Sequence, residues 1–325
     1  MLEHGGRLQQ AAREHGIPLD KWVDLSTGIH PVGYPVPSVP PECWLRLPED
    51  EDALLPTAAE YYGTSNLIAC AGSQAAIQTL PTLRPPCRVG VLSPTYAEHA
   101  HAWRRAGHDV EELSEARLDV DVLLLANPNN PTGRLFAPET LLAWRAEIAA
   151  RGGWLVVDEA FMDATPEISL AKHAGLPGLV LLRSIGKFFG LAGIRAGFLL
   201  AWPDLLQALQ ENLGPWSMAH PTRWVTQQAL CDTAWQMQNR DWLVSQSQRL
   251  ASLLATHGLQ PIGGTALFQY VAMMEAADLH AMLARQGILT RLFHNPAAVR
   301  LGLPGRNGEA EWDRLASALE GIRRA

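Results

Sequence analysis

The sequence predicts an α/β protein that has a large domain with a doubly wound, mostly parallel sheet and a smaller α+β domain. Short apolar runs recur between residues 66 and 202, and nearly all are apolar throughout, as in parallel strands covered on both faces. Helix-like stretches separate these runs, and that alternation is typical of βαβ units. A chain of 325 residues suits one large and one smaller domain better than two equal halves.

Each predicted element follows from its composition. Residues 31–48 contain six prolines, which predicts an extended, turning arm. The stretch from Pro221 to about His257 is rich in Ala, Gln, Leu and Trp and predicts a long helix that connects the domains. The predicted strands are 66–71, 88–92, 120–126, 154–157, 178–182, 196–202, 266–273 and 299–303, and the other predicted helices are 97–106, 138–151, 277–286 and one from Glu309.

These elements divide the chain into three predicted parts. Residues 1–45 are expected to form an N-terminal arm and part of the small domain. Residues 46–215 are expected to form the large domain, and residues 216–325 the connecting helix and the C-terminal small domain.

The charge balance excludes several classes of protein. Lys and Arg number 26 against 33 Asp and Glu, and the net charge of -7 gives no electrostatic footprint for nucleic acid or an anionic membrane. Four cysteines show no metal-binding or redox spacing, so we expect reduced thiols. The N-terminus resembles no secretion signal, and no apolar stretch approaches the roughly 20 residues of a membrane span. We therefore expect a cytoplasmic protein.

Several familiar sites are missing from the sequence. No Gly-x-Gly occurs, which excludes the dinucleotide-binding fingerprint. Gly186-Lys187 is not a P-loop, because no Ser or Thr follows it, and no Gly-x-Ser-x-Gly elbow is present. His99 and His101 lie two apart in a predicted helix, so we expect surface residues rather than a metal pair.

Two motifs lie at predicted strand ends. Residues 127–133, Asn-Pro-Asn-Asn-Pro-Thr-Gly, directly follow an apolar run. Taken by itself, this motif fits a turn as well as it fits a functional loop. Its position favours function, because ligands bind at the carboxyl ends of strands in open α/β sheets. Asp158 closes the next apolar run, and a buried carboxylate there needs a cationic or N–H partner. A helix N-cap is the alternative, and in isolation it is favoured.

Two further motifs supply positive charge. Lys187 is flanked by aromatic residues and glycines, in a segment with no other charge until Arg195. A lysine desolvated there would have a lowered pKa, as a Schiff-base amine requires, whereas a lone lysine after a strand is usually solvated. Gly72-Ser73-Gln74 joins a strand end to a helix start, where N–H groups and the helix dipole favour an anion. A plain Ser N-cap is the alternative.

Together these motifs match the needs of pyridoxal phosphate (PLP): an amine, a carboxylate for the ring nitrogen, a donor to the ring hydroxyl, a stacking ring and a phosphate cradle. Over essentially its whole length the chain resembles the fold-type I PLP-dependent enzymes of the aspartate aminotransferase superfamily. Asn-Pro-x-Asn-Pro-Thr-Gly, Asp-Glu-Ala and Ser-x-x-Lys, in this order and spacing, are highly specific for it. The resemblance implies PLP as the cofactor and a homodimer.

The resemblance also implies roles for individual residues. Lys187 would be the catalytic Schiff-base lysine, and Asp158 would be the partner of the pyridinium nitrogen. Asn130 would hold the ring hydroxyl and Tyr96 would stack on the ring. The cofactor phosphate would be bound by Gly72, Ser73, Gln74, Ser184 and Arg195. Arg300 resembles the arginine that receives the substrate carboxylate, although an exposed arginine at a strand end is the alternative.

Within the superfamily two groups are most similar: the L-threonine-O-3-phosphate decarboxylases of cobalamin biosynthesis and the histidinol-phosphate aminotransferases. His4-Gly5-Gly6 resembles the N-terminal segment of the decarboxylases, and Phe161 stands where the aminotransferases usually carry a tyrosine. The resemblance implies PLP-dependent decarboxylation of L-threonine O-3-phosphate, with a histidinol-phosphate-type or aromatic aminotransferase as the alternative. A PLP-binding regulatory domain and a non-catalytic paralogue are disfavoured.

The substrate phosphate needs its own cationic site. Gly28 and His30 replace asparagines of some decarboxylases, so the contacts to this phosphate do not carry over directly. Our hypothesis is that His4 and an arginine of the small domain, Arg291 or Arg300, contribute to the site. His4 adjoins two glycines, and a backbone without Cβ atoms can approach an anion closely. A disordered terminal residue is nearly as plausible.

Overall fold

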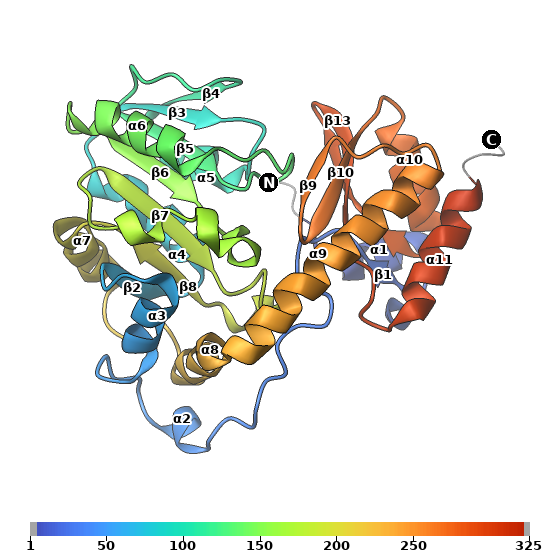
Figure 1. Ribbon diagram of the computed structural model, residues 1–325, viewed down its shortest axis with the longest axis horizontal. Coiled ribbons are helices and arrows are strands. Elements are labelled where there is room, and N and C mark those ends of the chain that lie inside the picture. The colour runs from blue at the N-terminus through green and yellow to red at the C-terminus, as the bar shows by residue number, and fades with distance from the viewer. Residues whose placement is uncertain (1–4, 322–325) are drawn as a thin grey trace. The chain divides into compact units, whose positions relative to one another are not determined.

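The computed structural model describes residues 5–321, which fall into two compact units (Figure 1). The large unit comprises residues 34–130 and 135–237, and the small unit comprises residues 5–33, 131–134 and 238–321. Between residues 5 and 321, no helix has both the length and the apolar composition that a membrane crossing requires.

A seven-stranded sheet forms the centre of the large unit, with the strand order β2-β8-β7-β6-β5-β3-β4. The strands are β2 (Leu67–Cys70), β3 (Arg88–Leu92), β4 (Asp109–Leu113), β5 (Val122–Ala126), β6 (Trp154–Asp158), β7 (Leu179–Ser184) and β8 (Gly197–Leu200). β8 pairs antiparallel with both β2 and β7, whereas the other described pairs in this sheet are parallel. The predicted mostly parallel sheet is therefore confirmed.

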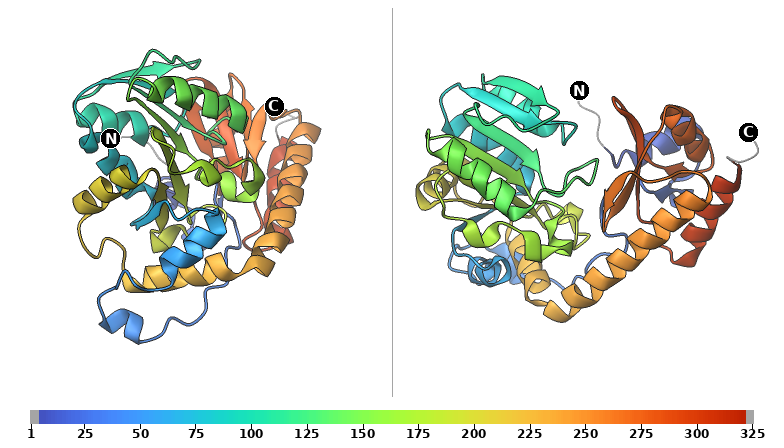
Figure 2. Two further views of the ribbon diagram at one scale, coloured as in Figure 1. Left: turned by 60° about the vertical axis from the view of Figure 1, so that its left-hand side comes forward. Right: turned by 45° about the horizontal axis from the view of Figure 1, so that its top comes forward.

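Helices cover both faces of this sheet (Figure 2). They are α3 (Leu54–Tyr62), α4 (Ser73–Thr79), α5 (Glu98–Arg105), α6 (Pro138–Ala149) and α7 (Pro203–Leu213), and the short α2 (Glu42–Leu45) precedes them. Ile77, Trp103 and Leu209, from α4, α5 and α7, share one buried cluster with Val122 and Leu124 of β5. Every residue of β5 and β6 is buried, which explains why these strands are apolar throughout.

The helix predicted over 221–257 is in fact two helices, α8 (His220–Cys231) and α9 (Thr233–Thr256). Asp232 lies between them with φ -83 and ψ 75, outside the helical region. Its carboxylate accepts the backbone N–H of Trp235 at 2.9 Å. Asp232 therefore caps the start of α9, and an uninterrupted helix is the wrong prediction.

The small unit combines sheets and helices, as the α+β prediction requires. Its four-stranded antiparallel sheet has the order β12-β13-β10-β9. These strands are β9 (Gly263–Thr265), β10 (Phe268–Ala272), β12 (Arg291–His294) and β13 (Ala297–Gly302), and β1 (Val23–Asp24) pairs in parallel with β11 (Ile288–Leu289). The helices α1 (Leu8–His15), α10 (Ala276–Arg285) and α11 (Glu309–Glu320) belong to the same unit.

Candidate active site

A cavity of about 150 Å³ lies in the large unit. It is lined by Gly72, Ser73, Gln74, Tyr96, Ala126, Asn130, Asp158, Ala160, Phe161, Ser184, Lys187 and Arg195. All the residues that the sequence associates with the cofactor therefore surround one cavity, although they come from segments far apart in the chain.

Strand direction explains why these segments meet. Ala126, Asp158 and Ser184 are the last residues of the parallel strands β5, β6 and β7, so they share one edge of the sheet. β8 runs the opposite way, which brings Arg195, just before its first residue, to that edge. β2 is antiparallel to β8 and so ends at the same edge, followed by Gly72. In open α/β sheets, this is the edge at which ligands bind.

Asp158 is held on both carboxylate oxygens. Oδ1 accepts the backbone N–H of Ala160 at 3.0 Å, and Oδ2 lies 2.9 Å from Nε2 of His99. Both side chains of the His99–Asp158 pair are buried, so the imidazole supplies the polar partner that a buried carboxylate needs. The prediction of a surface position is wrong for His99, whereas His101 is exposed. The spacing of the two histidines could not show which side of α5 faces the sheet.

Gly72 and Arg195 lie against each other. Gly72 has a φ of 75°, and a Cβ built on it would lie 2.9 Å from Nη2 of Arg195. Arg195 itself adopts the left-handed conformation, with φ 54 and ψ 59, which is uncommon for a residue other than glycine. A Cβ on Gly197 would lie 2.4 Å from the backbone nitrogen of Ser73, so the start of β8 touches the start of α4. The cavity thus combines helix N–H groups and a guanidinium, which favour an anion.

Tyr96 is oriented by a chain of hydrogen bonds. Its hydroxyl donates to Oε1 of Gln74 at 3.1 Å, and Nε2 of Gln74 donates to Oε2 of Glu98 at 3.0 Å. Burial, reinforced by the charges of Glu98 and Asp158, raises the pKa of Tyr96 to about 12. The phenol therefore remains neutral near pH 7 and keeps its donor. The side chain of Gln74 is engaged with its neighbours, which the sequence did not indicate.

Two asparagines fix the loop that carries Asn130. Oδ1 of Asn127 accepts the backbone N–H of Phe136 at 2.8 Å, and its Nδ2 donates to the carbonyl of the same residue at 3.2 Å. Nδ2 of Asn129 donates to the carbonyl of Pro94 at 2.9 Å, which joins this loop to the segment before Tyr96. The loop is therefore both closed and tied down, so Asn130 is presented to the cavity.

Lys187 lies in the turn after β7 and is half-buried. Its Nζ is 5.8 Å from the ring centroid of Phe161. The next two residues, Phe188 and Phe189, are fully buried, and the ring of Phe189 stacks on Trp235 with centroids 5.6 Å apart. The aromatic residues beside Lys187 therefore anchor its backbone in the core.

Residues adjacent in sequence to those that line the cavity form a cluster of buried charged side chains. Nη1 of Arg183, next to Ser184, lies 2.6 Å from Oε2 of Glu159, and Nη2 contacts Asp163. All three charged side chains are buried. The cluster ties the end of β7 to the segment that follows Asp158, and no local sequence pattern predicts it.

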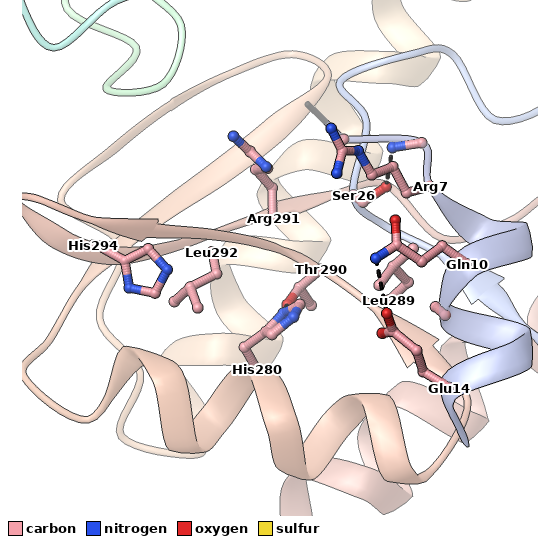
Figure 3. A pocket seen from close by; sticks show the side chains of 13 residues that line it. Arg7, Gln10, Glu14, Ser26, His280, Leu289, Thr290, Arg291, Leu292 and His294 are labelled. Atoms are coloured by element: carbon pink, nitrogen blue, oxygen red, sulfur yellow. Dashed lines mark hydrogen bonds between the residues drawn. The ribbon is translucent and has the colours of Figure 1, made fainter. Parts of the chain in front are cut away.

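Two of the three candidate substrate residues, Arg291 and Arg300, lie in the small unit, where Arg291 lines a cavity (Figure 3). Arg300 is buried, its Nη2 donates to the carbonyl of Ser26 at 2.9 Å, and its Cζ is 5.0 Å from the ring centroid of Phe268. Arg300 is therefore not an exposed arginine. Burial and then the charge of Arg291, its neighbour across the β12–β13 pairing, lower the pKa of Arg300 to about 10. His4 lies outside the described residues.

Relatives of the chain include threonine-phosphate decarboxylases and histidinol-phosphate aminotransferases. A threonine-phosphate decarboxylase from Pseudomonas aeruginosa is 57% identical over 99% of this chain and 98% of that protein. A threonine-phosphate decarboxylase from Sinorhizobium sp is 40% identical over 98% of this chain and 97% of that protein. A histidinol-phosphate aminotransferase from Shewanella oneidensis is 29% identical over 86% of this chain and 77% of that protein.

Solved structures share the fold. The histidinol-phosphate aminotransferase from Sinorhizobium meliloti, in complex with pyridoxal-5'-phosphate, has a TM-score of 0.83 and 22% identity, with 99% of this chain and 95% of that one covered. The L-threonine-O-3-phosphate decarboxylase from Porphyromonas gingivalis has a TM-score of 0.79 and 21% identity, with 93% and 99% covered. The model of the family "Aminotransferase class I and II" matches residues 48–319. Because this match spans most of the chain, the protein belongs to the aminotransferase class I and II family.

Proposed function

We propose that the protein is a PLP-dependent lyase that converts L-threonine O-3-phosphate to (R)-1-aminopropan-2-yl phosphate and carbon dioxide, a step of cobalamin biosynthesis. The observation that carries the proposal is the 57% identity, along nearly the whole of both chains, with a threonine-phosphate decarboxylase. The cavity supports it, because an amine, a carboxylate, a phenol and a guanidinium converge there.

The donor set of the cavity fits PLP. The missing Cβ of Gly72 leaves room beside the guanidinium of Arg195, as a phosphate cradle requires. Lys187 would attach the cofactor, Asp158 would hold its ring nitrogen, Asn130 its ring hydroxyl and Tyr96 its ring face. Gly72, Ser73, Gln74, Ser184 and Arg195 would bind its phosphate. When bound, PLP supplies an electron sink conjugated with Cα of the substrate.

The residues of the chain have separate tasks in this reaction. Asp158 would keep a proton on the ring nitrogen through its negative charge, and His99 fixes the orientation of that carboxylate. Lys187 would be the group that returns a proton to Cα of the substrate. Phe161, which has no hydroxyl, lines the cavity beside Lys187 and leaves the ring oxygen to Asn130.

The choice between decarboxylation and transamination depends on how the substrate is held. The bound cofactor would weaken one bond to Cα, so a decarboxylase would have to present the carboxylate for cleavage, whereas an aminotransferase would have to present the hydrogen on Cα. Arg300 is proposed to receive the carboxylate, because Ser26 and Phe268 fix its guanidinium. Arg291 and His4 are proposed to contribute to the phosphate site.

The proposed assembly is a homodimer. Trp44 and Leu45 of α2 are 68% and 85% exposed, and Leu47 is also exposed, so three large apolar side chains lie close together in sequence on the surface. Apolar surface of this kind marks an interface. Analytical ultracentrifugation of the holoenzyme should give the mass of two chains, and Leu45→Asp should shift it toward one chain. A monomeric wild type would exclude the homodimer.

The activity is tested by incubating the holoenzyme with L-threonine O-3-phosphate labelled at the carboxyl carbon and trapping the released gas. We expect labelled carbon dioxide without any requirement for 2-oxoglutarate. Lys187→Ala should release none, which is the matched control for spontaneous loss. Amino transfer from histidinol phosphate to 2-oxoglutarate, without carbon dioxide release from threonine phosphate, would favour the aminotransferase alternative instead.

A further inference from the structure

Phe161 forms one wall of the cavity around Lys187. Its side chain is buried, and it lines the cavity of the large unit together with the lysine. Nζ of Lys187 stands over the face of the ring, 5.8 Å from the ring centroid. This distance lies within the range at which an aromatic ring attracts a cation. The amine proposed to carry the cofactor therefore has an aromatic face as its neighbour.

The backbone that carries Phe161 is held on both sides of the ring. Glu159, two residues earlier, lies 2.6 Å from Nη1 of Arg183 through its Oε2. Asp163, two residues later, contacts Nη2 of the same guanidinium. These charged groups are all buried, so separating them would leave a charge without its partner in the core. The ring is thus fixed between two anchor points and cannot easily withdraw from the amine.

Lys187 is anchored independently of Phe161. Its neighbours Phe188 and Phe189 are buried, and the backbone N–H of Gly190 donates to the carbonyl of Lys187 at 3.1 Å. The amine follows β7 and the ring follows β6, so the two partners of the contact come from separate segments of the chain. Because both backbones are already held, little conformational entropy is lost when the amine and the ring meet.

Two opposing effects act on the charge of the lysine amine. Partial burial favours the neutral amine, whereas the negative face of the Phe161 ring favours the ammonium. The ring has no proton to exchange, so its attraction is the same at every pH. Among the residues described, Tyr96, Asp158 and Arg195 are the other titratable or charged groups that line the cavity, and His99 pairs with Asp158. All of them stay in place when residue 161 is replaced, so a comparison of variants isolates the ring.

The proposed reaction needs an acid beside Cα of the substrate. When carbon dioxide leaves, the bond between Cα and the carboxyl carbon breaks, its electron pair stays behind, and a C–H bond must form at Cα. The substrate amine enters protonated and can pass that proton to Nζ of Lys187 as it displaces the lysine. Transfer of the proton from Nζ to Cα then leaves a neutral amine that can release the product. One proton from solvent, taken up by the product amine, completes the balance.

We propose that Phe161 is a positioning residue for this proton transfer, because its ring face stabilises the ammonium form of Lys187, the form that donates the proton to Cα. The inference rests on the proposed function. The effect of the ring on the charge of the amine is nevertheless a property of the chain alone, so it can be measured in the apoenzyme. A tyrosine at position 161 presents the same ring face and should act in the same way.

The sequence suits this measurement, because it contains only three lysines. Lys21 and Lys172 are exposed and serve as references in the same sample. Trace acetylation of the apoenzyme with acetic anhydride, followed by mass spectrometry, reports the neutral fraction of each amine at a given pH. Phe161→Leu keeps an apolar wall without a ring face. Where the ammonium predominates, this variant should raise the neutral fraction of Lys187 about threefold to thirtyfold, whereas Phe161→Tyr should match the wild type.

Two controls separate the ring face from packing. Phe293 also has a cation over its ring, with Cζ of Arg291 5.3 Å from the centroid, but it does not line this cavity. Phe293→Leu should therefore leave the acetylation of Lys187 unchanged. A phenylalanine fluorinated around the ring, placed at position 161, keeps the shape and loses the negative face. It should reproduce the effect of Phe161→Leu even if the leucine variant packs poorly. Equal neutral fractions of Lys187 in the wild type and the fluorinated protein would overturn the proposal.

Kinetics separate the role of Phe161 from the proposed function itself. Because the ammonium is the donor, kcat should decline above the pH at which Nζ of Lys187 loses its proton. Phe161→Leu should move this decline to lower pH, with little change in KM. An unchanged pH profile of kcat in Phe161→Leu would overturn the role in proton transfer. A wild type that releases no carbon dioxide would refute the proposed function instead, while the acetylation result would still report on the ring and the amine.

Discussion

The imidazole of His99 and the carboxylate of Asp158 form a buried pair, with 2.9 Å between Nε2 and Oδ2. Because a hydrogen bond to a charged group contributes about 1.5–3 kcal/mol, His99→Ala should lower kcat/KM for threonine phosphate by about tenfold or more. The absorption spectrum of the bound cofactor and its pH dependence should shift as well. His101→Ala, two positions on, is the matched control and should leave both unchanged. A normal spectrum in His99→Ala would remove His99 from the site.

Gly72 and Gly107 allow steric and conformational effects to be separated. Both have positive φ, but a Cβ on Gly72 would meet the Arg195 guanidinium at 2.9 Å, whereas a Cβ on Gly107 meets nothing within 4 Å. Gly72→Ala should weaken PLP binding at least about tenfold, while Gly107→Ala should cost only about 1 kcal/mol of stability. Fluorescence titration of the apoenzyme with PLP measures the affinity. Equal PLP affinity in the two variants would show that Gly72 is not part of the cradle.

Arg183 balances two buried carboxylates, those of Glu159 and Asp163. Arg183→Met should lower the free energy of unfolding by about 3–5 kcal/mol at pH 7, because it leaves both anions without their cation. Urea unfolding of the variant and the wild type at pH 7 tests this, and a loss below about 1 kcal/mol would contradict it.

Asp232 lies between α8 and α9 and caps the start of α9 by accepting the backbone N–H of Trp235. Asp232→Ala should lower the free energy of unfolding by about 1 kcal/mol, the usual cost of removing an N-cap. Asp241, exposed within α9, is the matched control, and Asp241→Ala should stay within about 0.5 kcal/mol of the wild type. Chemical denaturation of both variants provides the measurement. Similar losses in the two variants would mean that Asp232 is not an effective cap.

The sequence was most informative where burial and strand direction act together. The central strands are apolar on both faces, which predicts a parallel sheet. The motifs that follow these strands lie at one edge of the sheet, because the carboxyl ends of parallel strands share an edge. The sequence does not predict β4, because its Asp-Val-Glu-Glu-Leu composition suits an edge strand in contact with water. Such a strand lacks the continuous apolar run that marks a buried strand. The break at Asp232 was missed because helix propensity on its two sides is high.

Other features depend on tertiary contacts. The inward direction of His99 follows from which side of α5 packs on the sheet, and two histidines two residues apart cannot show it. The pairing of Arg183 with Glu159 joins a strand to the segment after another strand, which no local pattern encodes.

The reversal of β8 gives the segment between Lys187 and Arg195 an unusual property. Hydrogen bonding holds its two ends side by side, because Ser184 pairs with Gly197 and the backbone N–H of Ile185 donates to the carbonyl of Ala196 at 3.2 Å. Each charged side chain is thus anchored by its own strand. A single proteolytic nick at Gly193 would leave the lysine and the arginine in place, so the two fragments should stay associated and still retain the coenzyme.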